Sequence, residues 1–539
     1  MWYSALVKKK SFLLSLILPL AVTLLSGCTI YDLFGVSDSK PGTSTQEGNY
    51  RTDFDPNGIG YYRAKGDKKM TPFTYRDINY SGGMDNIVSN GDAKLLCVPI
   101  EFTDYPFYGN SKSPYRSEEE MMSDFNIAFN GESEDTGYWE SLSSFYKKSS
   151  YGKFGLHVDF ADIYKTGETV SEFRSKDASS LKEAGHIIEM LENVVEGLRS
   201  SKGNDYLKQY DTDKDGWIDG IIMIYSCPDF RSDSSIQRID ASGSTFWAFC
   251  YWAAEDYGKV SAPTSNLFFW ASNSFFHEVA KKPRVDCHTI IHEFGHMLGL
   301  DDYYPAPGSS WNAAGGLMMM DENILDHDLF SKTALGWTEP YVVNGKKDLA
   351  LTISPSQLNG DCIVIPASNS WNQTAFSEYL ILDLYTPNGL NSLDSTRAYS
   401  SRTLGYDVPG VRMFHVDARL KAYQMNTATK KAEWVYYYKD SLPSNATFQV
   451  AATNCYKDSS RCDENYSLLA MVDADNTKNF RRGAVADNDS LFQTGDTFSF
   501  TKYRAYFPNG EKWNDGSSSS VTITFSEVKA DSATINFTF

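Results

Sequence analysis

The segment 287–304, CHTIIHEFGHMLGLDDYY, contains three histidines, one glutamate and two adjacent aspartates. His292 and His296 are four residues apart, and at about 3.6 residues per turn two such side chains lie on one face of a helix. Two imidazoles placed in this way can bind one metal ion, and Glu293 can reach a water molecule beside that ion. The HExxH spacing therefore indicates a metal centre with a carboxylate base.

A buried helix that ends sharply would position these side chains. Apolar residues recur at i, i+1, i+4, i+7 and i+8, a spacing that buries one helix face: Ile290, Ile291, Phe294, Met297 and Leu298. Gly299 lies three residues after His296, where glycine permits the positive φ that ends a helix and turns the chain back. Asp302 follows where a third ligand would stand, giving HExxHxxGxxD, and the choice between Asp301 and Asp302 stays open.

Two further features bear on the metal centre. The segment 315–321, GGLMMMD, can form a methionine turn beneath the metal, with Met320 chosen among three consecutive methionines. His288 lies four residues before His292 and could add a ligand, but we expect it to begin the helix or to contact the ligands instead. A bare HExxH also fits an ordinary surface helix, and the glycine and third acidic residue favour the metal centre.

A second group of carboxylates points to calcium. The segment DTDKDGWID places aspartates at the first, third, fifth and ninth positions of a calcium loop: Asp211, Asp213, Asp215 and Asp219. Gly216 permits the sharp turn that lets alternate carboxylates converge on one hard cation. The twelfth position is Ile222, so the bidentate glutamate of an EF-hand is missing. We expect a structural Ca²⁺ site here; the alternative is an acidic turn before the strand 218–226.

The N-terminus is typical of an exported protein. Three lysines at 8–10 precede an apolar run at 11–25, which is short for a transmembrane helix. The run ends in Leu25-Ser26-Gly27-Cys28, which looks like a bacterial lipobox with Cys28 as the lipidated residue. A plain secretory signal cut near Cys28 is the alternative. The sequence thus predicts a location at the bacterial cell surface, anchored to the membrane through lipid on Cys28 or released from it.

Length and charge limit the remaining possibilities. A chain of 539 residues is too long for one ordinary core, so we expect two or three domains. The formal net charge of −19 repels nucleic acid and argues against a DNA- or RNA-binding role. The sequence gives no indication of an oligomeric state.

The domain organisation follows from changes in composition and periodicity. We expect a signal peptide at 1–27, a tether and lead-in or short pro-segment at 28–93, an α/β (α+β) domain at 94–340, and a β-rich domain at 341–539. The β-rich part consists of short alternating segments separated by turn signals, a pattern typical of a sandwich. These segments are LALTIS, CIVIPA, SEYLILDLY, VRMFHVD, FQVAAT, SSVTITFS and SATINFTF.

Within the α/β part, apolar runs at 94–102, 218–226 and 245–253 predict strands. Ser180 and Glu183 have the spacing of a capping box and predict a helix that runs from there to about residue 198. A sheet flanked by helices is the arrangement that this mixture favours.

At this point a family resemblance is visible. The chain resembles the immune inhibitor A family of secreted bacterial metallopeptidases, a metzincin-like group, through HEFGHMLGLDDYY, GGLMMMD and SKTALGW at 331–337. FYKKSSYGKF at 145–154 and DTDKDGWIDG at 211–220 look like that family too, and the similarity covers roughly residues 94–420. The zinc motif is specific, whereas the other stretches are individually weak but occur in the expected order.

The resemblance implies a metzincin-like zinc peptidase domain with protein or peptide substrates. It implies Zn²⁺ bound by two histidines and an aspartate, an open position for water, a general base, a methionine beneath the site and a donor to the substrate oxyanion. The corresponding residues are His292, His296 and Asp302 as ligands, Glu293 as base, Met320 as the turn methionine, and Tyr304 or His327, unranked, as the oxyanion donor.

The main expectation is therefore an exported zinc endopeptidase, and two alternatives remain. One is a surface binding or adhesion lipoprotein in which the β-rich domain acts and the metal unit is inert. The intact Glu293 argues against inertness, because a decayed enzyme often loses its base. The other alternative is a zinc hydrolase of a different amide bond, which the ligand set alone does not distinguish from a peptidase.

Overall fold

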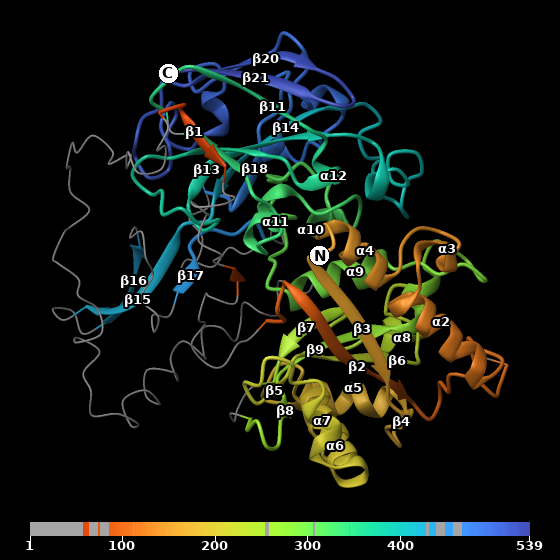
Figure 1. The fold of residues 1–539 in the computed structure, drawn as a ribbon. Coiled ribbons are helices and arrows are strands. Elements are labelled where there is room, and N and C mark those ends of the chain that lie inside the picture. The colour runs from red at the N-terminus through yellow and green to blue at the C-terminus, as the bar shows by residue number, and fades with distance from the viewer. Residues whose placement is uncertain are drawn as a thin grey trace.

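The computed structural model describes ten segments of the chain, which together form a mixed α/β protein with eleven α-helices and five sheets. The described segments are 58–63, 74–75, 86–111, 113–253, 258–305, 308–343, 345–426, 431–437, 448–455 and 466–539. Figure 1 shows a helix-rich part, in orange to yellow-green, below a strand-rich part in green to blue. The predicted mixture of helices and strands is confirmed.

A six-stranded sheet forms the centre of the helix-rich part. Four neighbouring strands, β3, β2, β6 and β9, are mutually parallel, β4 pairs with β2, and β7 joins β9 in the antiparallel sense at the end of the sheet. Three of these strands confirm the predictions for 94–102, 218–226 and 245–253, with shifted ends. The bounds are β2 Gly91–Glu101, β3 Phe154–Phe160, β4 Tyr164–Lys165, β6 Ile221–Tyr225, β7 Phe249–Trp252 and β9 Leu267–Ser272.

The strands of this sheet are apolar on both faces because helices cover both sides. Along β2, Leu95 and Cys97 belong to one hydrophobic cluster, whereas Leu96 and Val98 belong to another. The first cluster includes side chains from α2 Glu118–Asn130, α4 Leu142–Ser149 and α9 His288–Met297. The second includes side chains from α5 Val170–Ser179, α6 Gly185–Lys202, α7 Asn204–Lys208 and α8 Ser234–Ile239. The HExxH motif therefore lies on a helix that is packed against the central sheet.

The predicted start of the helix at Ser180 is wrong. Ser180 ends α5, where its backbone N–H donates to the carbonyl oxygen of Lys176, and α6 begins at Gly185 after Ala184 in a left-handed conformation with φ of 50°. The reason is an earlier capping box between Thr169 and Glu172, which starts a separate helix.

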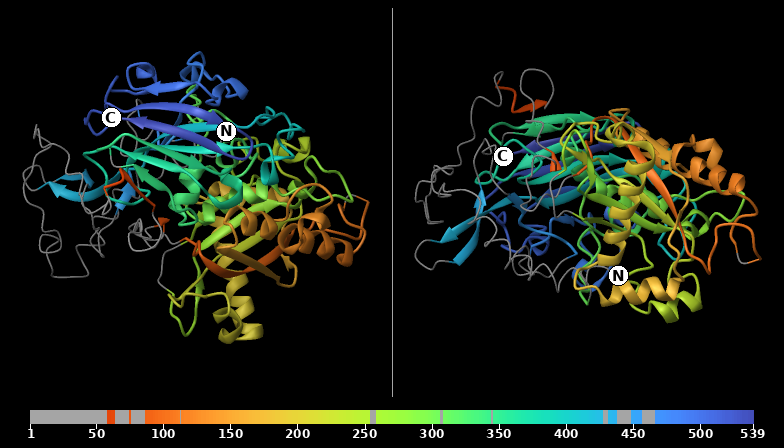
Figure 2. Two further views of the ribbon diagram at one scale, coloured as in Figure 1. Left: turned by 45° about the horizontal axis from the view of Figure 1, so that its top comes forward. Right: turned by 90° about the horizontal axis from the view of Figure 1, so that it is seen from below.

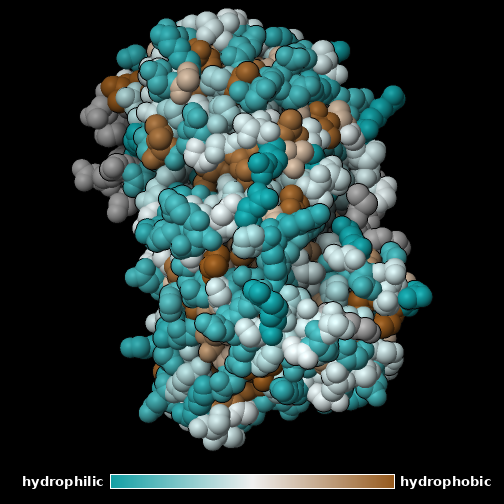
Figure 3. Space-filling view, turned by 90° about the vertical axis from the view of Figure 1, so that its right-hand side faces the viewer, coloured by the Kyte–Doolittle hydropathy of each residue, from teal (hydrophilic) through white to brown (hydrophobic). Residues whose placement is uncertain are grey.

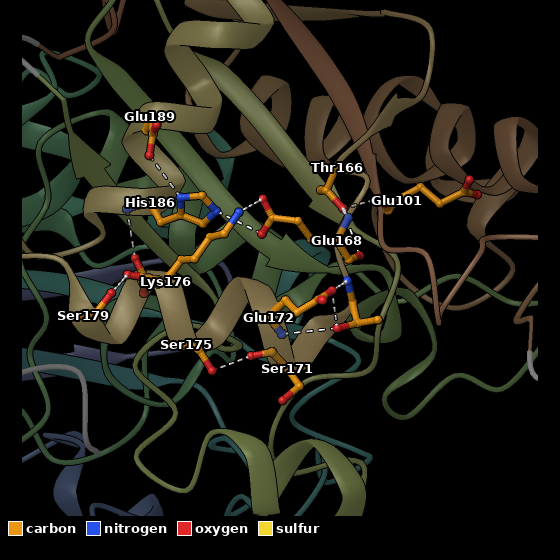
Figure 4. A network of polar contacts seen from close by, with 12 residues as sticks. Glu101, Thr166, Glu168, Ser171, Glu172, Ser175, Lys176, Ser179, His186 and Glu189 are labelled. Carbon is orange, nitrogen blue, oxygen red and sulfur yellow. Dashed lines mark hydrogen bonds and ion pairs between the residues drawn. The ribbon is translucent and has the colours of Figure 1, made fainter.

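A polar network ties α5 to α6. Lys176 Nζ and His186 Nε2 both approach the carboxylate of Glu168, at 2.7 Å and 3.1 Å (Figure 4). His186 Nδ1 also lies 3.2 Å from Glu189 on the same helix. The network lies at the surface, since 68% of the Glu189 side chain is exposed.

All seven segments predicted as strands after residue 340 are strands. They are β11 Leu349–Ile353, β12 Ile363–Pro366, β13 Glu378–Tyr385, β14 Gly410–Asp417, β17 Phe448–Val450, β20 Thr522–Val528 and β21 Ala533–Thr538. A six-stranded sheet has the order β1-β10-β12-β13-β14-β18, and a four-stranded sheet has the order β11-β21-β20-β19. The additional strands are β1 Tyr61–Arg63, β10 Tyr341–Val343, β18 Leu469–Met471 and β19 Thr497–Ser499. Side chains from both sheets form one hydrophobic cluster, and Figure 2 shows the blue strands lying over the green ones.

The hydrophobic core continues across residue 340, the predicted boundary between the two domains. The hydrophobic cluster that contains α9 also contains Tyr379, Phe414 and Met471 from the strand-rich part. The lead-in takes part as well, because β1 pairs with β10 and the Tyr75 ring lies 5.1 Å from that of Phe376. The two parts therefore share a core through which the strand-rich part supports α9, the helix of the HExxH motif.

The predictions for the N-terminus fall largely outside the structure. Residues 1–27 and Cys28 lie outside the described residues. Among the described residues, no helix is both long enough and apolar enough to cross a membrane. On the face shown in Figure 3, hydrophobic side chains are scattered among hydrophilic ones.

Candidate metal centre

The HExxH helix, α9, ends as its glycine predicts. Gly299 has φ of 99°, its N–H donates to His296 O at 3.0 Å, and Leu300 N donates to Gly295 O at 3.0 Å. A Cβ atom on Gly299 would lie 2.6 Å from the Cβ atom of Tyr75. Both the positive φ and the close approach of the lead-in therefore require glycine here. The turn that follows brings the chain back toward the two histidines.

Three side chains converge next to this turn. His292 Nε2 and His296 Nε2 each lie 3.1 Å from Asp302 Oδ1. The opposite ring nitrogens, Nδ1, lie 2.8 Å from the carbonyl oxygens of Met319 and Leu300, so they carry the protons and leave Nε2 as the ligand atom. Two imidazole nitrogens and one carboxylate oxygen are a donor set that suits zinc. Asp302, rather than the adjacent Asp301, belongs to this group.

The site is buried, and burial shifts the pKa values of its acidic side chains. Glu293 is the residue after His292 on α9, and only 8% of it is exposed. Burial raises the pKa of the Glu293 carboxyl, and the neighbouring imidazoles of His296 and His292 act in the opposite direction. Burial would also raise the pKa of Asp302, but the two imidazoles hold it well below its usual range. Asp302 is therefore ionised, as a metal ligand must be.

Met320 lies beneath the helix. It is fully buried in α10 Met319–Glu322, and a Cβ atom added to Gly295 would lie 2.5 Å from its sulfur. The carbonyl oxygen of Met320 accepts a hydrogen bond from Tyr303 N at 2.7 Å, while that of Met319 holds His292. The segment predicted as a methionine turn thus contacts the middle of the HExxH helix and orients its first histidine.

The two candidate oxyanion donors lie in different surroundings. Tyr304 donates its hydroxyl to Asp302 Oδ2 at 2.6 Å, and its ring is roughly parallel to that of His292, at an angle of 17°. His327 is 1% exposed, and its Nε2 lies 3.3 Å from the hydroxyl of Tyr146 in the core. Burial lowers the pKa of His327 to about 3, so this ring is neutral. Tyr304 therefore contacts the candidate ligand group directly, whereas His327 contacts Tyr146 in the core.

His288 takes no part in the group of ligands. It begins α9, is fully buried, and lies between two carboxylates, with Nδ1 at 2.7 Å from Asp286 and Nε2 at 3.2 Å from Asp394. Its ring stacks between those of Trp139 and Tyr399, with both ring centres 4.2 Å away. Because Asp394 belongs to the strand-rich part, His288 joins the start of α9 to that part.

Strand β7 connects the HExxH helix to the central sheet. It pairs with β9 in the antiparallel sense, and α9 packs against both β7 and β9. The charge of Glu293 acts on Cys250 in this strand, where burial raises the pKa of the thiol.

The predicted calcium loop brings three of its four aspartates together. One carboxylate oxygen from each of Asp211, Asp213 and Asp215 lies within 4.8 Å of the others. Gly216 has φ of 96° and donates its N–H to Asp211 Oδ2 at 3.2 Å, so the turn closes around that carboxylate. Asp219 is not in this group, and its Oδ1 accepts from Thr212 N at 3.1 Å. Ile222 is fully buried in β6 and offers no ligand.

Sequence reasoning missed the groups that orient the ligands. The carbonyl oxygens of Met319 and Leu300 are backbone atoms, so no residue type marks them.

Comparisons with known proteins do not assign the chain to a family. A scan against models of protein families gives no match, and a search of the curated proteins finds no matching relative. The functional argument therefore depends on the residues of the site itself.

Proposed function

We propose that this protein is a zinc-dependent endopeptidase with a metzincin-like catalytic unit, followed by a sandwich of the six- and four-stranded sheets. The observation that carries the proposal is the convergence of His292, His296 and Asp302, with both imidazoles turned by backbone carbonyls so that Nε2 faces the carboxylate. Three protein donors with one open position are typical of catalytic zinc, whereas structural sites are closed by four.

Each neighbouring side chain has a role in this proposal. A zinc ion held there would supply Lewis acidity, which lowers the pKa of water and polarises a peptide carbonyl. Glu293 would accept the proton of the attacking water and pass it to the leaving amine. Tyr304 would donate its hydroxyl to the oxygen that develops negative charge, exchanging its bond to Asp302 for one to the substrate.

We propose a peptide as the substrate because the HExxHxxGxxD segment resembles that of secreted bacterial metallopeptidases. The buried, intact Glu293 favours an enzyme over an inert binding lipoprotein.

The remaining expectations complete the proposal. We propose Ca²⁺ at Asp211, Asp213 and Asp215, where it would hold the loop before β6 by neutralising three carboxylates that otherwise repel one another. Export and lipid attachment at Cys28 rest on the N-terminal sequence alone. In this proposal the protein acts on proteins or peptides outside the cell, at the bacterial membrane surface.

The experiment uses soluble protein that begins after Cys28. The wild type, Glu293→Gln and the matched control Glu189→Gln, which changes an exposed glutamate on α6, are incubated with unfolded casein. We expect the wild type and Glu189→Gln to cut casein, and a zinc chelator to stop both. Glu293→Gln should lose activity by roughly 10²–10⁴-fold because it cannot accept a proton. Undiminished cleavage by Glu293→Gln, or cleavage that survives chelation, would exclude the proposal.

A further inference from the structure

The lead-in packs against the turn that brings Asp302 to the two histidines. Its described residues before the central sheet are 58–63, 74–75 and 86–90. A Cβ atom on Gly299, at the start of that turn, would lie 2.6 Å from the Cβ atom of Tyr75 and 2.9 Å from the Nδ2 atom of Asn86. Tyr75 and Asn86 are both buried. Two separate positions of the lead-in therefore contact the same residue of the turn.

The backbone of the lead-in also holds the end of α9. Ile87 N donates a hydrogen bond to the carbonyl oxygen of Met297, the last residue of this helix, at 2.9 Å. The carbonyl groups of the last helical turn have no partner within a helix, so a donor from elsewhere stabilises the helix end. Ile87 is itself buried in the hydrophobic cluster that contains α9. The lead-in thus contacts both the end of the helix and the start of the turn.

The turn positions two of the three candidate ligands. Asp302 lies in it, and the carbonyl oxygen of Leu300 orients the ring of His296 at 2.8 Å. The far end of the turn is held at Tyr303, whose N–H donates to the methionine segment at 2.7 Å. The near end is held at Gly299 by the lead-in. A shift of the near end would therefore move both the Asp302 carboxylate and the carbonyl that orients His296.

The lead-in is anchored to both parts of the molecule. The ring of Tyr75 meets that of Phe376 edge to face, with the ring centres 5.1 Å apart. Ser89 Oγ and Asn90 Nδ2 donate to the carbonyl oxygen of Leu335, at 2.8 Å and 2.9 Å. Strand β1 pairs with β10 of the six-stranded sheet. Removing the lead-in would therefore break contacts with the core as well as with the turn.

We propose that the lead-in, from residue 58 onward, is a permanent part of the metal centre and not a pro-segment that is removed on activation. Tyr75 and Asn86 are positioning residues in this proposal, acting on zinc through the turn that carries Asp302. The inference rests on the proposed zinc site and adds what that site requires to bind its ion tightly. Partners that orient metal ligands typically contribute roughly 10–100-fold to metal affinity.

The test measures zinc affinity in protein that begins after Cys28. The zinc dissociation constant of the wild type, Tyr75→Ala and Tyr62→Ala is determined by competition with a chromogenic chelator. Tyr62→Ala is the matched control, because Tyr62 is also a buried tyrosine of the lead-in, but it lies in β1 and pairs with Val342. Tyr75→Ala should raise the dissociation constant by roughly 10–100-fold, whereas Tyr62→Ala should leave it unchanged.

Three further proteins separate positioning from general loss of packing. Tyr75→Phe keeps the ring that packs on the turn and should restore the affinity of the wild type. Asn86→Ala removes the second contact with Gly299 and should also weaken zinc binding, so the test does not depend on whether Tyr75→Ala folds. Protein that begins at Gly91, the first residue of β2, lacks the lead-in and should not match the zinc affinity of the longer protein.

The outcomes distinguish this inference from the proposed function. Wild-type zinc affinity in folded Tyr75→Ala or Asn86→Ala, or equal weakening by Tyr75→Ala and Tyr62→Ala, would overturn the positioning role. Protein beginning at Gly91 that binds zinc and cuts casein as well as the longer protein would show that the lead-in is dispensable. If the wild type binds zinc tightly, the variants follow the prediction and casein is not cut, the peptidase fails and the lead-in inference stands.

Discussion

Replacing His288 by glutamine should remove a large, pH-dependent part of the stability that joins the two parts of the molecule. Burial alone would lower the pKa of His288, but the carboxylates of Asp394 and Asp286 raise it from 6.5 to about 10. Because the folded protein binds this proton more tightly than the unfolded chain, the charged imidazole stabilises the fold. The stabilisation is complete below pH 6.5 and is lost as the pH rises through 10.

The size of the effect follows from the two pKa values of His288. At about 1.36 kcal/mol per pH unit, the interaction contributes at most roughly 4 kcal/mol at pH 7 and about 1 kcal/mol at pH 9. The wild type should therefore lose up to about 3 kcal/mol of unfolding free energy between these pH values through this residue. His288→Gln should be less stable at pH 7, and the difference from the wild type should shrink as the pH rises.

The assay is urea unfolding of the wild type and the variant at half-unit steps from pH 6.5 to 10. His186→Gln is the matched control, since His186 also faces two carboxylates, Glu168 and Glu189, but near the surface, where solvent weakens such pairs (Figure 4). Only His288→Gln should converge with the wild type at high pH. A difference between His288→Gln and the wild type that stays constant across this range would refute the argument that a charged His288 holds the fold.

Three other substitutions test separate contacts. Gly295→Ala should lower the unfolding free energy by about 1–3 kcal/mol, because its Cβ atom would overlap the Met320 sulfur. Gly197→Ala is the control and should be neutral or stabilising, since no atom lies within 4 Å of its Cβ position. Equal effects of the two substitutions in urea unfolding would contradict this packing. Calcium should raise the thermal midpoint of the wild type and not that of Asp213→Asn, and the same rise in both would exclude the loop as the site. Tyr304→Phe should retain zinc and lower kcat by roughly 10²-fold with little change in KM; unchanged kcat would remove Tyr304 from the mechanism.

Local spacing was enough to predict much of the HExxH helix, α9. The i, i+4 histidines, the apolar stripe and Gly299 depend on contacts within a few residues, so the helix, its buried face and its sharp end follow from the sequence. The turn after Gly299 then brings Asp302 back to both histidines. Alternation of apolar and polar residues likewise predicted seven strands after residue 340, and the structure contains all seven.

Long-range pairing could not be predicted from the sequence. Asp394 lies 106 residues after His288, and no local pattern connects the two positions. His327 is close enough to the metal motif to suggest a catalytic role, yet it is buried against Tyr146, which precedes it by 181 residues. The start of α6 was wrong for a local reason, because the capping box at Thr169 started an earlier helix that Ser180 completes. In each case the position of the residue depends on a contact that its own sequence neighbourhood does not reveal: Asp394 for His288, Tyr146 for His327, and the Thr169–Glu172 capping box for Ser180.

The most direct test of the proposal is the zinc content of the purified protein. Protein beginning after Cys28 is dialysed against excess zinc and then against buffer, and bound metal is measured for the wild type, Glu293→Ala and His296→Ala. The proposal predicts one zinc per chain in the wild type and in Glu293→Ala, because Glu293 is not a ligand, and a large loss in His296→Ala. Folded wild-type protein that retains no zinc would contradict the metal centre and leave the surface binding lipoprotein as the better explanation.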